Sequence, residues 1–228
     1  MKIKTLRRLR IGVLLGFVFF LTACMLLPDF IGQSKAGKYD PTVTSQRPSK
    51  SADVPIAETQ TEPHTCGLHA MRSMYAAYGL DPAVFRLRFR LGTDQPATQL
   101  DSESTGTLHP DLYRVLAQDG FIAEPMDLEV DNAGRELLQH IERSQLALVL
   151  VYRNTYHWVL VGPSGTRNAC VVYDSLKNEP VDTAIDALLD DALSITLVRP
   201  AETGVYISSS EAHAAGLAEM ARLYQRKE

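Results

Sequence analysis

Apolar residues first recur along the chain at helical spacing. From Cys66 to Tyr78 they stand three or four positions apart, and Gly79 follows as a C-terminal cap. The same spacing predicts helices from about Pro110 to Gln118 and from Ala133 to Ser144. The first half of the periodic sequence is therefore predicted to be mainly helical.

The period changes at Leu146. The segment Leu146–Tyr152 is a continuous apolar run of strand length, as expected for a strand covered on both faces. The segments Tyr156–Val161 and Cys170–Asp174 are rich in valine and aromatic residues, and they predict a hairpin with a wide loop. Helices first and strands afterwards predict an α+β domain with an antiparallel sheet.

A last helix is predicted after Pro200. Ser208 and Glu211 have the spacing of a capping box. The apolar residues that follow lie on one face of an amphipathic helix: Leu217, Met220 and Leu223 or Tyr224. We expect this helix to dock on the domain or to bind a partner protein.

The first 23 residues have the pattern of an export signal. Five basic residues and no acidic one precede the apolar run Ile11–Leu21. The adjoining residues Leu21–Cys24 resemble the bacterial lipobox, in which the cysteine is acylated and becomes the first residue of the mature chain. An uncleaved anchor is the alternative, because the run extends through Leu27 to about the lower length of a membrane span. Both interpretations tether the chain to a membrane in the cell envelope. Met25 directs such a lipoprotein to the outer membrane, on its periplasmic side, if the host is Gram-negative.

The chain is thus predicted to have four parts. Residues 1–23 are the signal peptide, and residues 24–55 are the lipidated Cys24 with a flexible, polar tether. Residues 56–200 form one domain, and residues 201–228 carry the C-terminal amphipathic helix.

Composition narrows the classes of function. Hydrophobic residues make up 45% of the 228 positions and charged residues 22%, which suits a folded core. Removing the first 23 residues leaves 18 basic against 27 acidic residues, so no basic surface is available for nucleic acid. The sequence contains no phosphate loop, no flavin or nicotinamide fingerprint and no calcium loop, so we expect no cofactor.

Cys66 is the candidate nucleophile. It begins the first predicted helix, where free N–H groups and the helix dipole stabilise a thiolate. A thiolate nucleophile needs a base, and the base needs a third group to orient it. If Val161 pairs with Cys170 in the hairpin, His157 lies directly opposite Asp174, with the Cβ atoms roughly 5 Å apart.

Gln60 stands six residues before Cys66 and can donate its side-chain amide to the oxyanion of a tetrahedral intermediate. Gln60, then Cys66-Gly67, a helix, His157 entering a valine-rich strand and Asp174 together resemble the C39-type, papain-like cysteine peptidases. The resemblance covers about residues 56–200. It implies a papain-like fold in which a helical half carrying the cysteine packs on an antiparallel sheet carrying the histidine. The implied roles are nucleophile for Cys66, general base and acid for His157, orienting carboxylate for Asp174 and oxyanion donor for Gln60.

Two residues depart from the pattern of that family. Thr65 precedes the cysteine, where members often have Asp or Asn, and Ser175 follows Asp174, where many have proline. These departures concern the double-glycine leader specificity of the best-known members more than the thiol chemistry.

The same residues also allow other interpretations. Cys66 and Cys170 invite a disulfide in an exported protein, although Cys170 fits a buried core thiol better. The spacing of His64, Cys66 and His69 would suit metal ligation, but zinc usually needs three or four ligands and no nearby pattern supplies the rest. Trp158 is predicted to be a core residue. Surface positions are predicted for His109, His140 and His213, and helix-end charges for Asp111 and Asp119.

Two classes of function follow. The first is a membrane-tethered, exported cysteine peptidase or related thiol hydrolase that cleaves peptide bonds through an acyl-enzyme at Cys66. The second is a lipoprotein binding module that keeps the papain-like fold to hold a peptide or partner protein, with little or no turnover. The predicted partners are a peptide or protein substrate and the membrane through Cys24.

Overall fold

The structure is a computed structural model that describes residues 47–95, 106–152, 154–177, 179–205 and 207–225. The predicted signal peptide, Cys24 and most of the predicted tether lie outside these residues. In the part of the chain that is described, no helix is both long enough and apolar enough to cross a membrane.

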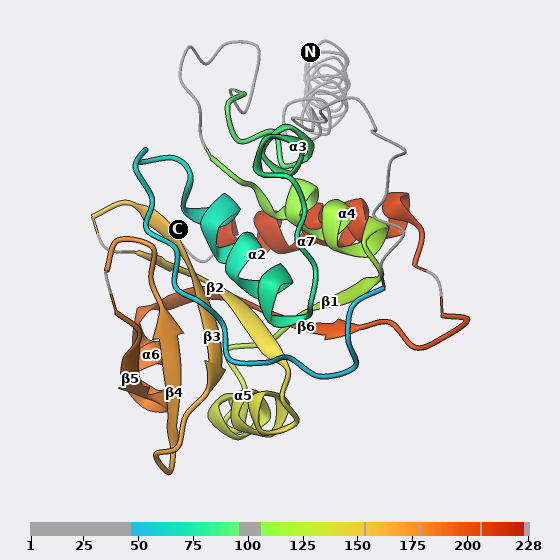
Figure 1. The fold of residues 1–228 in the computed structure, drawn as a ribbon. Coiled ribbons are helices and arrows are strands. Elements are labelled where there is room, and N and C mark those ends of the chain that lie inside the picture. The colour runs from blue at the N-terminus through green and yellow to red at the C-terminus, as the bar shows by residue number, and fades with distance from the viewer. Residues whose placement is uncertain (1–46, 96–105, 153, 178, 206, 226–228) are drawn as a thin grey trace, which may run out of the picture. The chain divides into compact units, whose positions relative to one another are not determined.

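The described chain forms one sheet with helices around it (Figure 1). The strands run antiparallel in the order β1-β6-β2-β3-β4-β5. They are β1 (Phe121–Pro125), β2 (Leu146–Tyr152), β3 (Tyr156–Pro163), β4 (Ala169–Tyr173), β5 (Val181–Ala184) and β6 (Ala192–Pro200). The helices are α2 (Cys66–Ala77), α3 (Val84–Arg90), α4 (His109–Gln118), α5 (Ala133–Glu142), α6 (Ile185–Asp191) and α7 (Ser209–Gln225).

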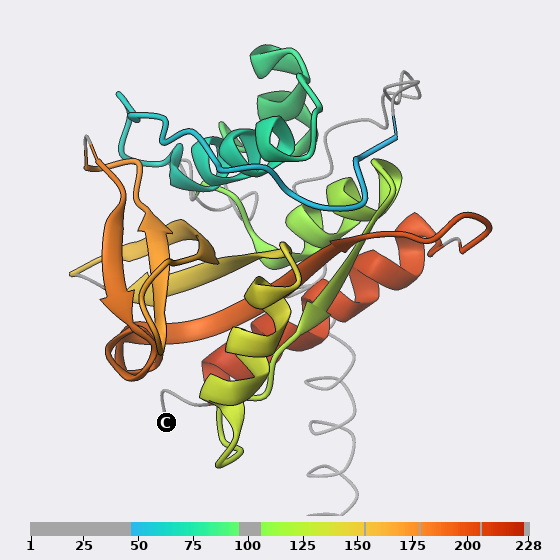
Figure 2. The ribbon, with the colours of Figure 1, turned by 60° about the horizontal axis from the view of Figure 1, so that its bottom comes forward.

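Helices cover both faces of the sheet. α2 and α4 pack on one face and α5 and α6 on the other (Figures 1 and 2). The strand β2 shows why its sequence is apolar throughout: Leu148 joins the core beneath α2 and α4, whereas Val149 joins the core beneath α5 and α6. Successive side chains of a strand point to opposite faces, so a strand covered twice needs apolar residues at every position.

The predicted elements around the candidate site are confirmed. The helices predicted to begin near residues 66, 110 and 133 correspond to α2, α4 and α5, and the three predicted strands correspond to β2, β3 and β4. The predicted capping box is also present, because Ser208 and Glu211 each accept a hydrogen bond from the backbone N–H of the other. The α+β class with an antiparallel sheet is correct.

Five elements of the described chain were not predicted from the sequence, and β6 matters most among them because it lies inside the sheet, between β1 and β2. The other four are α3, α6, β1 and β5. Two polar residues interrupt the apolar pattern of β6, and both are completely buried: Ser194 and Thr196. Each is held there by a hydrogen bond, to His109 and Tyr113 respectively, so burial does not leave their hydroxyls unpaired.

The predicted register of the β3–β4 hairpin is wrong by two residues. Cys170 pairs with Pro163 rather than with Val161, and Tyr173 pairs with Leu160. Asp174 follows the last paired residue and is therefore offset from His157 rather than directly opposite it. Because side chains alternate with a period of two, a slip of two residues leaves every side chain on its predicted face.

The final residues of the predicted tether lie against the domain. The backbone N–H groups of Ser49 and Asp53 donate to the carbonyls of Tyr78 and Ala77, at 3.0 and 2.8 Å, and Pro55 is buried. The folded part of the chain therefore begins earlier than the predicted residue 56.

Of the histidines predicted at the surface, His109 and His140 are buried and His213 is half-buried. Asp111 and Asp119 lie at the ends of α4 as predicted, in its first turn and at its C-cap, and both are buried. Asp119 shows the reason. Arg90 donates to it at 2.8 Å and the Tyr75 hydroxyl donates at 2.6 Å, both from buried side chains. A buried charge is tolerated when it is paired and hydrogen-bonded, and such partners come from other elements.

The helix α7 docks on α4 and β6, and of the apolar residues that the sequence predicted to face inward, Leu223 packs against the core. The buried residues of α7 are Ala212, Gly216 and Glu219. Leu217, Met220 and Leu223 are half-buried, and Tyr224 is exposed. Gly216 allows this docking, because a Cβ there would lie 2.6 Å from the carbonyl oxygen of His109.

Candidate active site

Cys66 is the first residue of α2, and 6% of its surface is exposed. The helix directs its free N–H groups toward this end, which favours a negative charge. Gly67 brings the helix close to the sheet, because a Cβ at that position would lie 2.5 Å from Cβ of Thr107 and 3.1 Å from Cδ1 of Trp158. The thiol is thus fixed at the junction between α2 and β3.

His157 lies near the start of β3 and Asp174 directly after β4, each with 3% of its surface exposed. Nε2 of His157 donates to Oδ1 of Asp174 at 2.7 Å. The same oxygen accepts the backbone N–H of Leu176 at 2.9 Å. Asp174 is therefore held from two sides, and it fixes the orientation of the imidazole ring.

Cys66 is the second partner of His157. Burial by itself lowers the pKa of His157, but the hydrogen bonds with Asp174 and Cys66 and the charges of both raise it to about 9. Because Nε2 is bonded to Asp174, the ring nitrogen left for the thiol is Nδ1. The imidazole of His157 therefore lies between the Cys66 side chain and the Asp174 carboxylate.

Gln60 lies beside this group, but its side chain is engaged. Ser175 Oγ donates to Gln60 Oε1 at 2.6 Å, and Gln60 Nε2 donates to the backbone carbonyls of Glu62 and Pro63, at 3.2 and 3.4 Å. The backbone N–H of Gln60 also donates to the carbonyl of Ser175, at 2.9 Å. The amide therefore ties the loop before Cys66 to the end of β4. Its role as oxyanion donor stays a prediction.

No family model and no curated protein matches the chain. Among solved structures, the peptidase domain of Streptococcus ComA, a bi-functional ABC transporter involved in a quorum sensing pathway, matches with a TM-score of 0.50. The two share 15% sequence identity over 65% of this chain and 99% of that domain.

This chain has the fold of a C39-type, papain-like peptidase domain. A double glycine motif protease from an AMS/PCAT transporter, solved in complex with its leader peptide, has a TM-score of 0.49. It shares 15% identity over 68% of this chain and 99% of that chain. The predicted fold is confirmed, and the predicted helical half and sheet half meet at Cys66 and His157.

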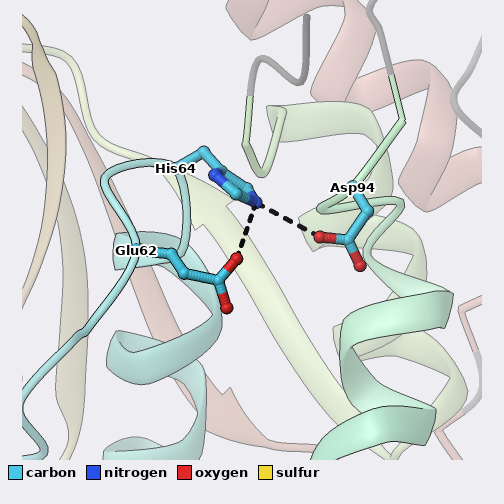
Figure 3. A group of neighbouring side chains, drawn as sticks. All are labelled: Glu62, His64 and Asp94. Carbon is cyan, nitrogen blue, oxygen red and sulfur yellow. Dashed lines mark hydrogen bonds and ion pairs between the residues drawn. The ribbon is translucent and has the colours of Figure 1, made fainter.

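His64, two residues before Cys66, forms a polar cluster with Glu62 and Asp94 (Figure 3). His64 Nε2 lies 3.2 Å from Asp94 Oδ1 and 3.6 Å from Glu62 Oε2. Arg88 of α3 contacts all four carboxylate oxygens of Glu62 and Asp94, at distances between 2.6 and 2.9 Å. These hydrogen bonds lower the pKa of both carboxyl groups. The cluster is an ion-pair network that joins α3 to the loop before the thiol.

The metal set suggested by the spacing of His64, Cys66 and His69 is not assembled. The three side chains have different partners: His64 contacts Asp94, Cys66 contacts His157, and Nδ1 of His69 lies 3.2 Å from Glu58 Oε2. Arg72 donates to the same Glu58 oxygen at 2.6 Å. Both flanking histidines therefore belong to ion-pair networks on either side of the thiol.

The two departures from the family pattern have structural partners. Thr65 Oγ1 donates to the carbonyl of Glu62 at 2.8 Å and closes the turn before α2. Ser175 holds Gln60, as described above. No signal in the sequence pointed to Arg88 or Asp94, because an ion pair between separate segments leaves no local pattern.

Proposed function

We propose that the chain is a cysteine peptidase that cleaves peptide bonds through an acyl-enzyme at Cys66. The observation that carries the proposal is the pairing of one buried imidazole with both Cys66 and Asp174, which raises the pKa of His157 to about 9. A histidine in that state is charged at neutral pH, and it favours the thiolate form of its neighbour.

The residues then divide the reaction as follows. The Cys66 thiolate attacks the carbonyl carbon of the scissile bond and forms a tetrahedral oxyanion next to the N-terminus of α2. His157 donates its proton to the leaving amine as the C–N bond breaks, which leaves a thioester on Cys66. Water then attacks the thioester while His157 takes up a proton, and the acid product leaves with the thiolate restored. Asp174 keeps the imidazole oriented throughout.

The proposal includes the location of the enzyme. The basic and apolar residues 1–23 and the lipobox ending at Cys24 support export and attachment to a membrane of the bacterial envelope. Residues 24–46 then supply a tether between the lipid and the folded domain. An exported thiol hydrolase at a membrane surface acts on peptides or proteins of the envelope.

One observation favours the second candidate, a binding module with little turnover. The Gln60 amide donates to two backbone carbonyls, so it does not point a free N–H toward Cys66. A peptidase requires donors for the oxyanion, whereas a module that only holds a peptide does not. In an active enzyme the amide turns from these carbonyls to the substrate.

A covalent probe distinguishes the two. We would incubate the purified full chain with a peptidyl chloromethyl ketone and locate the adduct by mass mapping of the digested protein. The peptidase predicts a stoichiometric adduct on Cys66 at pH 6, which is absent from Cys66→Ala and retained in Cys170→Ala. A quenched-fluorescent peptide mixture then reports turnover in the wild type.

Two results would overturn the peptidase. One is turnover that survives in Cys66→Ala. The other is a Cys66 that reacts no faster than a free thiol at pH 6, while the peptides still bind. That second result would establish the binding module instead.

A further inference from the structure

The C-terminal helix α7 carries a buried carboxylate into the domain. Glu219 has 2% of its surface exposed, although Ala218, the small apolar residue beside it, is exposed. One of the Glu219 oxygens accepts a hydrogen bond from Ser194 Oγ of β6 at 2.8 Å, and the other lies 3.1 Å from a guanidinium nitrogen of Arg222. Burying a carboxylate is unfavourable unless it is paired. Arg222 lies on α7 itself, so the hydrogen bond from Ser194 is the contact that joins Glu219 to the sheet.

Ser194 also forms a hydrogen bond with His109, and the donor of each of the two bonds is fixed. Glu219 can only accept, so the Ser194 hydroxyl must donate to it. The Ser194 oxygen is then the acceptor for Nε2–H of His109, at 3.1 Å. His109 is the first residue of α4 and is buried. Glu219 therefore fixes the tautomer and the orientation of an imidazole on another helix.

His109 in turn packs against the wall of the thiol site. Its ring centroid lies 4.8 Å from that of Trp158. Trp158 Nε1 donates to the carbonyl of Thr107 at 2.9 Å. Both Trp158 and Thr107 are in contact distance of the position where Gly67 would carry a Cβ.

The contacts of His109, Trp158 and Thr107 involve residues that are next to His157 and Cys66 in the chain. Trp158 follows His157 in β3, and Gly67 follows Cys66 in α2. A displacement of His109 changes the packing of Trp158 and Thr107, and so changes the spacing between the imidazole and the thiol. The sequence resemblance to C39-type peptidases extends to about residue 200, so α7 lies beyond it.

We propose that Glu219 of α7 is a positioning residue that acts through Ser194, His109 and Trp158 on the Cys66–His157 pair. The inference rests on the proposed function, because it requires a reactive thiol to position. It assigns to the C-terminal helix a role within its own domain.

The test is the rate of Cys66 alkylation by iodoacetamide between pH 5 and 10, measured on the full chain in detergent with the modified residue identified by mass. Glu219→Ala removes the acceptor, and we expect the plateau rate to fall about tenfold to a hundredfold, the scale of a 1 Å misplacement. The alkaline limb, which is set by His157, should move to lower pH. Glu219→Gln keeps an acceptor oxygen for Ser194 and should restore the rate to within about threefold.

Glu211→Ala is the matched control, because it removes the same side chain from an exposed position of the same helix. It breaks the capping box with Ser208 and so weakens the start of α7 without touching the path through Ser194. Its rate and pH profile should equal those of the wild type. Circular dichroism establishes that each variant is folded at the temperature of the assay. If Glu219→Ala does not fold, Ser194→Ala breaks the same path while leaving Glu219 in place, and it should lower the rate in the same way.

The outcomes separate the two claims. Wild-type rates and pH profiles in the folded Glu219 or Ser194 variants would overturn the role of α7 while leaving the peptidase standing. A mere loss of stability would lower the melting temperature without moving the pH profile, and would also overturn it. A wild-type Cys66 that titrates as a free thiol would overturn both.

Discussion

His157 and His109 each have only 3% of their surface exposed, yet burial leads them to opposite states of charge. The pKa of His157 is raised to about 9, because its hydrogen bonds and charge interactions with Asp174 and Cys66 outweigh burial. The pKa of His109 is lowered to about 3 by burial, and the side-chain hydrogen bond of its ring is to the neutral hydroxyl of Ser194. A direct carboxylate contact is therefore what separates the protonated buried histidine from the neutral one.

The difference in charge fits the imidazole of His157 for proton transfer and that of His109 for a structural hydrogen bond. His157 holds a proton that it can transfer at neutral pH, and its second nitrogen reaches a thiol. His109 stays neutral and uses its one N–H to hold Ser194. The two rings are connected through Trp158, which is next to His157 in the chain and in ring contact with His109.

Removing the charged ring gives the largest expected effect. In His157→Ala the Cys66 thiol loses its imidazolium, and an ordinary thiol ionises near pH 8.5. We expect alkylation of Cys66 at pH 6 to slow by about a hundredfold or more. The half-buried His213 of α7 provides the control, since His213→Ala should leave the rate unchanged. A wild-type rate in His157→Ala would show that the thiol is not paired with this ring.

Replacing the Asp174 carboxylate should make His157 more like the neutral His109. In Asp174→Asn burial persists while the largest opposing contribution is lost, so the pKa of His157 should fall from about 9 toward its ordinary value of 6.5 or below it. The alkaline limb of the alkylation profile should follow, with roughly a tenfold change for each pH unit. Titration of the imidazole by NMR checks the assignment. If the alkaline limb of the Cys66 alkylation profile did not move, Asp174 would orient the His157 ring without raising its pKa.

The neutral histidine should make stability depend on acid. Its pKa is lower in the fold than its ordinary value of 6.5, so between pH 6.5 and about 3 the unfolded chain binds a proton that the fold does not. The free energy of unfolding therefore decreases as pH falls through that range, by up to about 1.4 kcal/mol per pH unit from this group. Urea unfolding from pH 7 to 4 should show a shallower decrease in His109→Gln. Parallel curves for the two proteins would contradict this explanation.

The smallest effect should come from the second cysteine. Cys170 is fully buried, its thiol donates to the Thr183 carbonyl at 3.6 Å, and burial raises its pKa to about 11. We expect Cys170→Ala to leave the alkylation rate of Cys66 within about twofold, at a stability cost of about 1 kcal/mol from the lost buried sulfur. Rapid modification of Cys170 in the folded wild type would show that burial is not what separates the two thiols.

Local patterns predicted the elements that carry the site. The helix beginning at Cys66 and the strands of His157 and Asp174 have clear periods, and the resemblance to a known family supplied their roles. The pairing register was wrong because a wide loop does not specify which residues meet. It still placed His157 and Asp174 on one face, since the error was an even number of residues.

Long-range polar pairs could not be predicted. The inward position of Glu219 depends on Gly216, which lets the backbone of α7 approach α4 so closely that the small side of the helix is buried. A rule that places large apolar residues inward therefore misses Gly216 and Glu219. Likewise Arg88 joins Glu62 to Asp94 across three segments, and none of the three carries a local sign of the contact.

The strand order implies that the sheet is completed late in folding. β6 is the last strand in the chain, yet it lies between β1 and β2 and pairs with both. Synthesis must pass residue 200 before β1 has its partner, and β2 keeps an open edge until then. Pairing between distant segments is slow, so the sheet closes late. For a chain proposed to cross a membrane, late closure would keep the polypeptide unfolded during passage, and Cys66 and His157 would meet only on the far side.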